Sequence, residues 1–414
     1  MKFITIAKTV TKMKLSTLAK MAIDKIGAMK LKLDIYINLK LGKYKSFKIV
    51  KASEIGEIVN VFKPITKEKV KLMRVFGFIE DGSFELTYPA INLNLFEDAM
   101  VEGKTDYVIV GDKIFWPKYF RYNFNKNIAR DKDLFECRKN TVIIRTPVAK
   151  RSFEVAFSLL GVHAHVWSHS LSEYYTKLVE IKNVLSIEKG ELIVLCPRYT
   201  DEQLKKIVYD YLSNYDRVKI VPVEDGEVVM VKRLYYMERP AAFTDHETYV
   251  AIGDNMQPKI VADIIRMELV MPLTRCADDL TYPKKLFLPR RSLYRGLTNN
   301  DEVEAYFKSK GFVFIEPHKI SLEEKIKYFR NADIIVGPFS SAFSNVVFSK
   351  PGTKVLMFSN YQRIFESWLS MHYQHFNIDM LFVTGFDVKK ENSAHTSFYI
   401  PLDKIKEASR FLGI

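Results

Sequence analysis

Three arginines gather in one short stretch of the chain. Arg290, Arg291 and Arg295 lie within six residues, between an apolar segment and a predicted helix that begins near Asn299. Guanidinium groups match phosphate oxygens, and a helix N-terminus adds exposed N–H groups and a partial positive charge. The pattern therefore predicts a diphosphate-binding site. The alternative is a basic surface turn whose arginines pair with nearby acids such as Glu302.

A second stretch, residues 336–345, is rich in small side chains and joins a predicted strand to a short helix. Small residues let backbone N–H groups and serine hydroxyls approach a nucleotide closely. The alternative is an ordinary tight turn with serine capping, because neither a dinucleotide fingerprint nor a P-loop is present. The predicted ligand-binding residues are Arg290, Arg291, Arg295, Asn299, Gly337, Pro338, Ser340, Ser341, Ala342 and Asn345.

Histidines cluster in a third region. His163, His165 and His169 fall within seven residues of a chain that has only eight histidines. Glu173 follows His169 by four positions, so on a helix both side chains point the same way. Two structural histidines with a surface glutamate are the alternative. A metal site would need a fourth ligand, and the sequence offers none nearby.

Together these segments resemble glycosyltransferase family 61, the type found in capsular polysaccharide biosynthesis. An upstream segment is similar to the family's Asn-x-x-His-Trp-x-x-Glu helix start, with His169 and Glu173 kept and with Val166 and Ser170 in place of Asn and Trp. The chain before about residue 140 shows no resemblance. The matching residues between 285 and 357 are Arg290, Arg291, Arg295, Asn299, Glu302, Ser321, Glu323, Phe329, Ala332, Asp333, Gly337, Pro338, Asn345, Phe348, Pro351 and Gly352.

The resemblance implies an inverting enzyme that moves a sugar from a nucleotide-sugar donor to a glycan or lipid-linked acceptor, on a two-lobed GT-B scaffold without a bound metal. Under this hypothesis His169 and Glu173 deprotonate the acceptor hydroxyl. The arginines, assisted by Ser340 and Ser341, neutralise the leaving diphosphate. No Asp-x-Asp motif is found at a strand end, since Asp278 and Asp279 precede a strand.

The chain departs from the family in its loop, which is typically Gly-Pro-His-Gly-Ala-Gly-Leu-x-Asn. Here residues 339–343 are Phe-Ser-Ser-Ala-Phe. A different donor and an inactive homologue are therefore alternatives. Two further hypotheses are a polysaccharide pyruvyl transferase or related two-lobed transferase, and a non-catalytic glycan- or nucleic-acid-binding homologue. The net charge of +14 allows the last, but the aromatic residues do not follow an RNA-recognition pattern, so no nucleic-acid partner is expected.

The order of predicted elements indicates an α/β fold. Strands and helices alternate over 151–245 and again over 246–414, which predicts parallel sheets. We expect a GT-B-like pair of Rossmann-type domains with an N-terminal basic helix and a β-rich extension. The expected units are an extension (1–60), an acceptor-side α/β domain (61–250), a Rossmann-like donor domain (251–395) and a C-terminal helix (396–414).

Local patterns predict individual elements. Short strands are expected over 34–150, among them 34–41 and 74–80. A helix over 201–214 has Thr200 and Asp201 as N-cap candidates, and a helix over 300–311 ends at Gly311. Ser321 and Glu324 have the spacing of a capping box. A further helix is expected over 360–376.

Composition limits the cellular setting. Residues 1–33 place apolar side chains at near-helical spacing among lysines, which predicts a basic amphipathic helix that either contacts an anionic membrane or packs on its own domain. No run of 18 or more apolar residues is present, so neither a transmembrane helix nor a signal peptide is expected. The cysteines, Cys137, Cys196 and Cys276, are too scattered for a disulfide framework. We expect a cytoplasmic protein, peripheral at the inner membrane face if the basic helix binds lipid.

Overall fold

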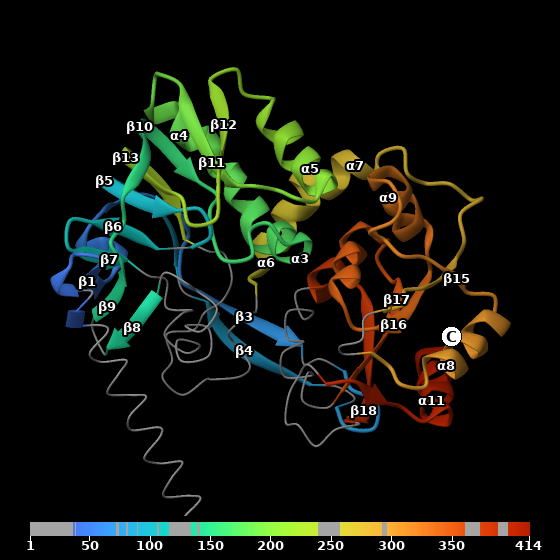
Figure 1. Cartoon of the computed structure of the whole chain (residues 1–414). Helices are drawn as coiled ribbons and strands as arrows, with labels where there is room; N and C mark the ends of the chain where they lie inside the picture. The colour runs from blue at the N-terminus through green and yellow to red at the C-terminus, as the bar shows by residue number, and fades with distance from the viewer. Residues whose placement is uncertain are drawn as a thin grey trace, which may run out of the picture.

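The computed structural model describes residues 36–37, 39–71, 74–79, 82–88, 90–105, 107–115, 134–138, 141–238, 257–291, 296–360, 373–387 and 396–414. These residues form a mixed α/β structure with an N-terminal lobe and a C-terminal lobe, joined by a helical connector (Figure 1). The predicted basic helix over 1–33 and most of the predicted helix over 360–376 lie outside the described residues.

The N-terminal lobe is built on one eleven-stranded mixed sheet. β10 pairs in parallel with β11 and β13, and β11 with β12, so the predicted parallel arrangement of this region is confirmed. The sheet continues through antiparallel β5 into the β-rich extension. Its strands are β1 (Tyr44–Val50), β2 (Glu57–Lys63), β5 (Ile91–Glu102), β6 (Val108–Val110), β7 (Lys113–Phe115), β8 (Leu134–Arg138), β9 (Thr141–Arg145), β10 (Ala149–Ser158), β11 (Leu192–Pro197), β12 (Val218–Val223) and β13 (Val228–Met237).

The short η1 of this lobe lies between β1 and β2, and its other helical segments follow β10 and β11. The stretch after β10 is continuous but irregular, because a π-helical turn and a 3-10 segment interrupt it. The segments are η1 (Ala52–Glu54), α3 (Trp167–His169), η3 (Ser170–Tyr174), η4 (Tyr175–Glu180), α4 (Ile181–Ile187) and α5 (Glu202–Leu212).

A hairpin of β3 (Thr66–Lys71) and β4 (Ser83–Tyr88) runs between the lobes (Figure 1). The segment between its strands reaches the C-terminal sheet, where the Phe76 amide donates to the Phe382 carbonyl at 2.8 Å. The predicted strand over 74–80 is wrong, because Gly77, at a φ of +71°, turns the chain back within it. The strand predicted over 34–41 is also wrong, since Tyr36 and Ile37 are helical.

The C-terminal lobe contains a six-stranded sheet whose first five strands are parallel. In chain order these five take the spatial order 2-1-3-4-5, which has its topological switch point between β14 and β16. The elements are β14 (Lys285–Phe287), α8 (Asn300–Ser309), β15 (Val313–Phe314), α9 (Leu322–Asn331), β16 (Ile334–Pro338), η6 (Ser341–Phe348), β17 (Lys354–Asn360), β18 (Asp379–Asp387), β19 (Phe398–Tyr399) and α11 (Leu402–Leu412).

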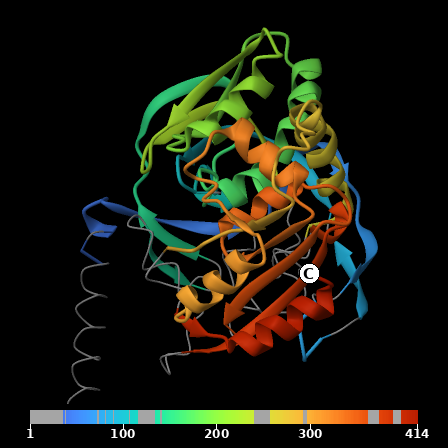
Figure 2. The ribbon, with the colours of Figure 1, turned by 90° about the vertical axis from the view of Figure 1, so that its right-hand side faces the viewer.

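Local signals place the helix ends as predicted. The Asp201 carboxylate accepts from the amides of Gln203 and Leu204, and Ser321 forms a capping box with Glu324. Gly311 follows α8 at a φ of +78°, a left-handed conformation that glycine adopts without strain. The predicted C-terminal helix is α11, which lies across the six-stranded sheet (Figure 2) and buries its apolar face there.

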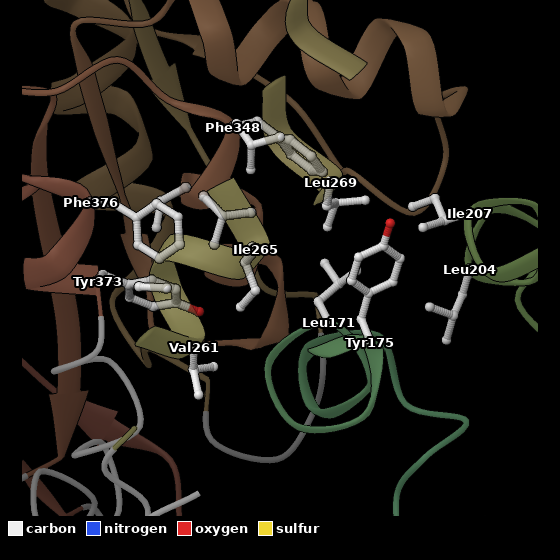
Figure 3. Packing of buried hydrophobic residues seen from close by; sticks show 14 of the residues in the cluster. Leu171, Tyr175, Leu204, Ile207, Val261, Ile265, Leu269, Phe348, Tyr373 and Phe376 are labelled. Carbon is white, nitrogen blue, oxygen red and sulfur yellow. The ribbon is translucent and has the colours of Figure 1, made fainter. Parts of the chain in front are cut away.

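A connector formed by α6 (Lys259–Ile264), η5 (Ile265–Val270) and α7 (Met271–Thr274) lies between the lobes. Figure 3 shows its Ile265 and Leu269 facing Leu171 and Tyr175 of the N-terminal lobe, with Phe348 of η6 on the other side. All of these residues belong to a single buried cluster. The two lobes therefore share one hydrophobic core.

Replacement of Phe348 by alanine tests this shared core. Phe348 is fully buried, so the variant should lose about 3–5 kcal/mol of unfolding free energy. Because the core is continuous, urea unfolding followed by circular dichroism should show both lobes destabilised in one transition. Phe386→Ala is the control, since Phe386 is 71% exposed and its loss should change stability by about 0.5 kcal/mol or less. Two separate transitions, with only one shifted, would contradict the shared core.

Candidate functional site

The two predicted ligand-binding loops meet at the switch point of the C-terminal sheet. Arg290 follows β14, Phe339 follows β16, and these strands are neighbours. The Arg290 Nη1 donates to the Phe339 carbonyl at 3.1 Å, which links the loops directly. Ligands of open parallel sheets bind outside the carboxyl ends of strands at such a point.

Gly337 makes the close approach of these strands possible. A Cβ at this position would lie 2.3 Å from the Leu288 carbonyl oxygen, and its φ of +156° is one that side chains disfavour. Pro338 is buried directly after it. The glycine at the end of this strand is therefore explained by the close approach of the Leu288 backbone.

The helix η6 begins beside this junction. Ser340 has an extended backbone and its side chain makes no capping bond to the helix. Ser340 and Ala342 are half-buried and Ser341 is exposed, whereas Phe343 is buried in the shared core. Asn345 is also buried, and its amide donates to the Ala342 carbonyl at 2.8 Å. Since the serine side chain does not cap the helix, the first-turn N–H groups can serve an anion.

Arg291 has a different environment from Arg290. It is exposed, and it forms a two-pronged ion pair with Glu304 of α8, at 2.6 and 3.0 Å. Glu302, the acid considered from the sequence, instead accepts from Asn299 at 3.0 Å. Asn299 also donates to the Ile400 carbonyl at 2.9 Å, so it ties the start of α8 to the chain near α11. Of the predicted arginines, Arg295 lies outside the described residues.

His169 and Glu173 form a dyad on the helical stretch after β10. The His169 Nδ1 lies 2.6 Å from the Glu173 Oε1, which confirms the predicted common face. The His169 side chain is 23% exposed and that of Glu173 is 3% exposed. A buried carboxylate on Nδ1 orients the ring and directs Nε2 away from the dyad. The His163 ring lies beside the His169 ring, with centroids 4.8 Å apart and the ring planes tilted by 34°.

The dyad and the ligand-binding loops come from different lobes, yet they lie close to each other. α3, which ends at His169, packs against η6. Two polar contacts run along this seam between the lobes. The Gln203 side chain donates to the Ile320 carbonyl at 2.7 Å, and the Lys325 Nζ lies 3.8 Å from the centroid of the Trp167 ring.

Comparison with known families decides the assignment. The family model described as glycosyltransferase 61 matches residues 167–356, which begin at α3 and end in β17. The chain carries a family 61 glycosyltransferase region. The match supports glycosyltransferase activity, which implies a sugar donor and an acceptor as partners. No curated protein matches the chain.

The family 61 region includes every predicted site residue, from His169 to Asn345. Sequence reasoning missed Lys325 and its contact with Trp167, although a signal was present. Lys325 lies one turn from both Leu322 and Phe329, on the apolar face of α9, where a lysine is unexpected.

Two further predictions concern a metal ion and a membrane. Among the described residues, no three His, Cys, Asp or Glu side chains cluster as metal ligands would. Transfer without a metal stays a prediction. No helix in the described ranges is long and apolar enough to cross a membrane.

The burial of Lys325 predicts a pH-dependent stability. Burial lowers the pKa of the Lys325 ammonium to about 8, and the Asp201 carboxylate acts in the opposite direction. The unfolded chain, with an ordinary pKa near 10.5, binds the proton more tightly, so unfolding free energy should rise with pH between about 8 and 10.5. Below pH 8, Lys325 is protonated in both the folded and the unfolded chain. The full destabilisation from its burial, roughly 3 kcal/mol, then applies.

Urea unfolding of wild type and Lys325→Met at several pH values measures this effect. The difference between the two proteins should change by up to about 1.4 kcal/mol per pH unit in that window and stay flat between pH 6 and 7.5. Buried tyrosines ionise equally in both proteins, so they cancel. A constant difference across the whole range would contradict the low pKa.

Proposed function

We propose that the protein catalyses inverting, metal-independent transfer of a sugar from a nucleotide-sugar donor to a glycan or lipid-linked acceptor. The observation that carries the proposal is the His169–Glu173 dyad, which sits where α3 packs against the donor-side helix η6. A base and a leaving-group site on opposite sides of one reaction centre are what single displacement requires.

In this mechanism the His169 Nε2 accepts the proton of the acceptor hydroxyl. The oxygen then forms a bond to the anomeric carbon while the bond from that carbon to the diphosphate oxygen breaks, which inverts the configuration. Glu173 holds the ring through Nδ1 and stabilises the imidazolium that forms, because its carboxylate is buried against the ring. The proton leaves to solvent from the partly exposed His169 side chain.

The leaving diphosphate is assigned to the junction of β14 and β16. Arg290 and the first turn of η6, with Ser340 and Ser341, would neutralise its charge. Arg291 can contribute if a phosphate replaces Glu304 as its partner, since both present oxygens to the same guanidinium fork. The proposed donor set also includes Arg295, Asn299, Gly337, Pro338, Ala342 and Asn345.

The proposed architecture is GT-B-like. Residues 61–250 would bind the acceptor and residues 251–395 the nucleotide sugar, with residues 1–60 as an extension and 396–414 as the closing helix. The 2-1-3-4-5 strand order of the C-terminal sheet supports its donor role. Membrane contact through residues 1–33, which would suit a lipid-linked acceptor, stays a prediction.

Variants of the dyad test the base. His169→Ala should lower kcat by about 10²–10⁴-fold because proton removal is lost, with little change in donor KM. Glu173→Gln should lose less, since a neutral amide still contacts the ring but no longer stabilises its charged form. His318→Ala is the matched control, because that side chain is 74% exposed in the other lobe. Near wild-type turnover by His169→Ala would remove the assignment.

Replacement of Arg290 tests the diphosphate site. Loss of a charge-assisted contact is worth about 1.5–3 kcal/mol, so Arg290→Ala should bind nucleoside diphosphates about 10- to 100-fold more weakly by calorimetry. Arg198→Ala, at an exposed ion pair of the N-terminal lobe, should bind as wild type does. Unchanged affinity in Arg290→Ala would reject the site. Binding of phosphoenolpyruvate without any response to nucleoside diphosphates would instead indicate a pyruvyl transferase.

A further inference from the structure

Lys325 is a charged side chain in an apolar place. It lies on α9 of the C-terminal lobe, is only 3% exposed, and shares this helix with the buried side chains Ile326 and Phe329. Its ammonium group does not turn toward solvent but lies over the ring of Trp167, 3.8 Å from the centroid. Trp167 is the first residue of α3 in the N-terminal lobe.

A second contact lies beside the first. The start of α9 is preceded by Ile320, whose carbonyl accepts from Gln203 of α5 at 2.7 Å. Asp201, the N-cap of α5, is the carboxylate that acts electrostatically on Lys325. The start of α9 and the residue before its cap therefore contact two N-terminal-lobe helices, α3 through the Trp167 ring and α5 through the Gln203 side chain.

α3 is a short segment that receives contacts from the other lobe as well as from its own helical stretch. α3 has only three residues, and the π-helical turn Ser170–Tyr174 follows it directly. A π turn interrupts the regular hydrogen-bonding pattern of an α-helix, and side-chain contacts of Ser172 with Ser168 and of Glu173 with His169 tie α3 to this turn. Contacts from the other lobe add to these local ones. His169 is the last residue of α3, two positions after Trp167.

We propose that Lys325 is a positioning residue, which fixes the start of α3 across the lobe seam and thereby sets His169 against η6. The inference rests on the proposed base role of His169. An apolar side chain could fill the same space at a lower desolvation cost. A cation is attracted to the face of the indole and not to its edge, so Lys325 determines the orientation of the Trp167 ring as well as its place.

The test compares Lys325→Met, Lys325→Arg and Lys327→Met in the full-length protein. Misplacement of a catalytic group by about 1 Å can cost 10²-fold, so Lys325→Met should lower kcat by about 10- to 100-fold with donor KM within about 2-fold. Lys325→Arg keeps the cation over the ring and should restore most of kcat. Lys327→Met removes a lysine that pairs with Glu323 on the solvent side of α9, and it should behave as wild type.

Tryptophan fluorescence gives a readout that does not need activity. The protein has three tryptophans, and subtraction of the Trp167→Phe spectrum isolates Trp167. Loss of the cation should shift the Trp167 emission in Lys325→Met but not in Lys327→Met, and the shift should persist in a His169→Ala background. If His169→Ala stays active, the proposed function fails, while the emission change still reports on the seam contact.

The inference is overturned if Lys325→Met keeps kcat within about 2-fold of wild type, whatever the emission shows. It is also overturned if Lys325→Arg and Lys325→Met lose kcat equally, since Arg should retain the contact. Should Lys325→Met fail to fold, Trp167→Phe perturbs the same contact from the other lobe. That variant should show the same fall in kcat at constant donor KM, and unchanged kcat would reject the proposal.

Discussion

The connector between the lobes carries apolar side chains on two opposite faces. The hydrophobic effect favours burial of both faces. Ile265 and Leu269 meet Leu171 and Tyr175 on one side, while Phe348 closes the other. Burial of this much apolar surface holds the two sheets in one relative position. The Tyr175 hydroxyl adds direction, since it donates to the Glu268 carbonyl at 3.0 Å. Because the dyad follows on from the same helical stretch, the position of the site depends on this packing.

Two charged side chains are buried at the interface between the lobes, where apolar side chains are expected. Glu173 and Lys325 are both almost fully buried, which is costly unless each has a partner. Glu173 contacts the His169 ring, and Lys325 lies over the Trp167 ring and feels the charge of Asp201. Both groups act on α3, one from its own helix and one from the opposite lobe. At this interface, apolar packing holds the two lobes together, and contacts of the charged side chains orient α3.

The two sheets contribute differently to the candidate site and to the contact between the lobes. The C-terminal sheet is nearly all parallel and brings the ends of β14 and β16 together, where Arg290 binds the backbone of Phe339. The N-terminal sheet has a parallel part and a long antiparallel extension. The hairpin β3–β4 leaves that extension and reaches β18 of the other lobe through Phe76. The segment between β3 and β4 therefore contacts the C-terminal lobe although it belongs to the N-terminal part of the chain.

Much of this protein follows from local sequence pattern. Periodicity and caps located α5, α8 and α9, because Asp201, Gly311 and Ser321 act on neighbours within one turn. The four-residue spacing of His169 and Glu173 determined their common face. The composition of the loops after β14 and β16 identified the candidate donor site, and the residues of the family pattern indicated the enzyme class that the family match supports.

Contacts between distant segments were decided only by the tertiary structure. Nothing in the pattern around Arg291 selects Glu304 over Glu302, since the choice depends on how the loop meets α8. The segment predicted as a strand turns back at Gly77, and its Val75 forms a bridge to Phe382, far along the chain, a partner that the local pattern does not indicate. The contact of Lys325 with Trp167 likewise joins two lobes. Such contacts arise when whole helices and strands pack together. A local sequence pattern does not indicate which distant segment will pack against a given helix or strand.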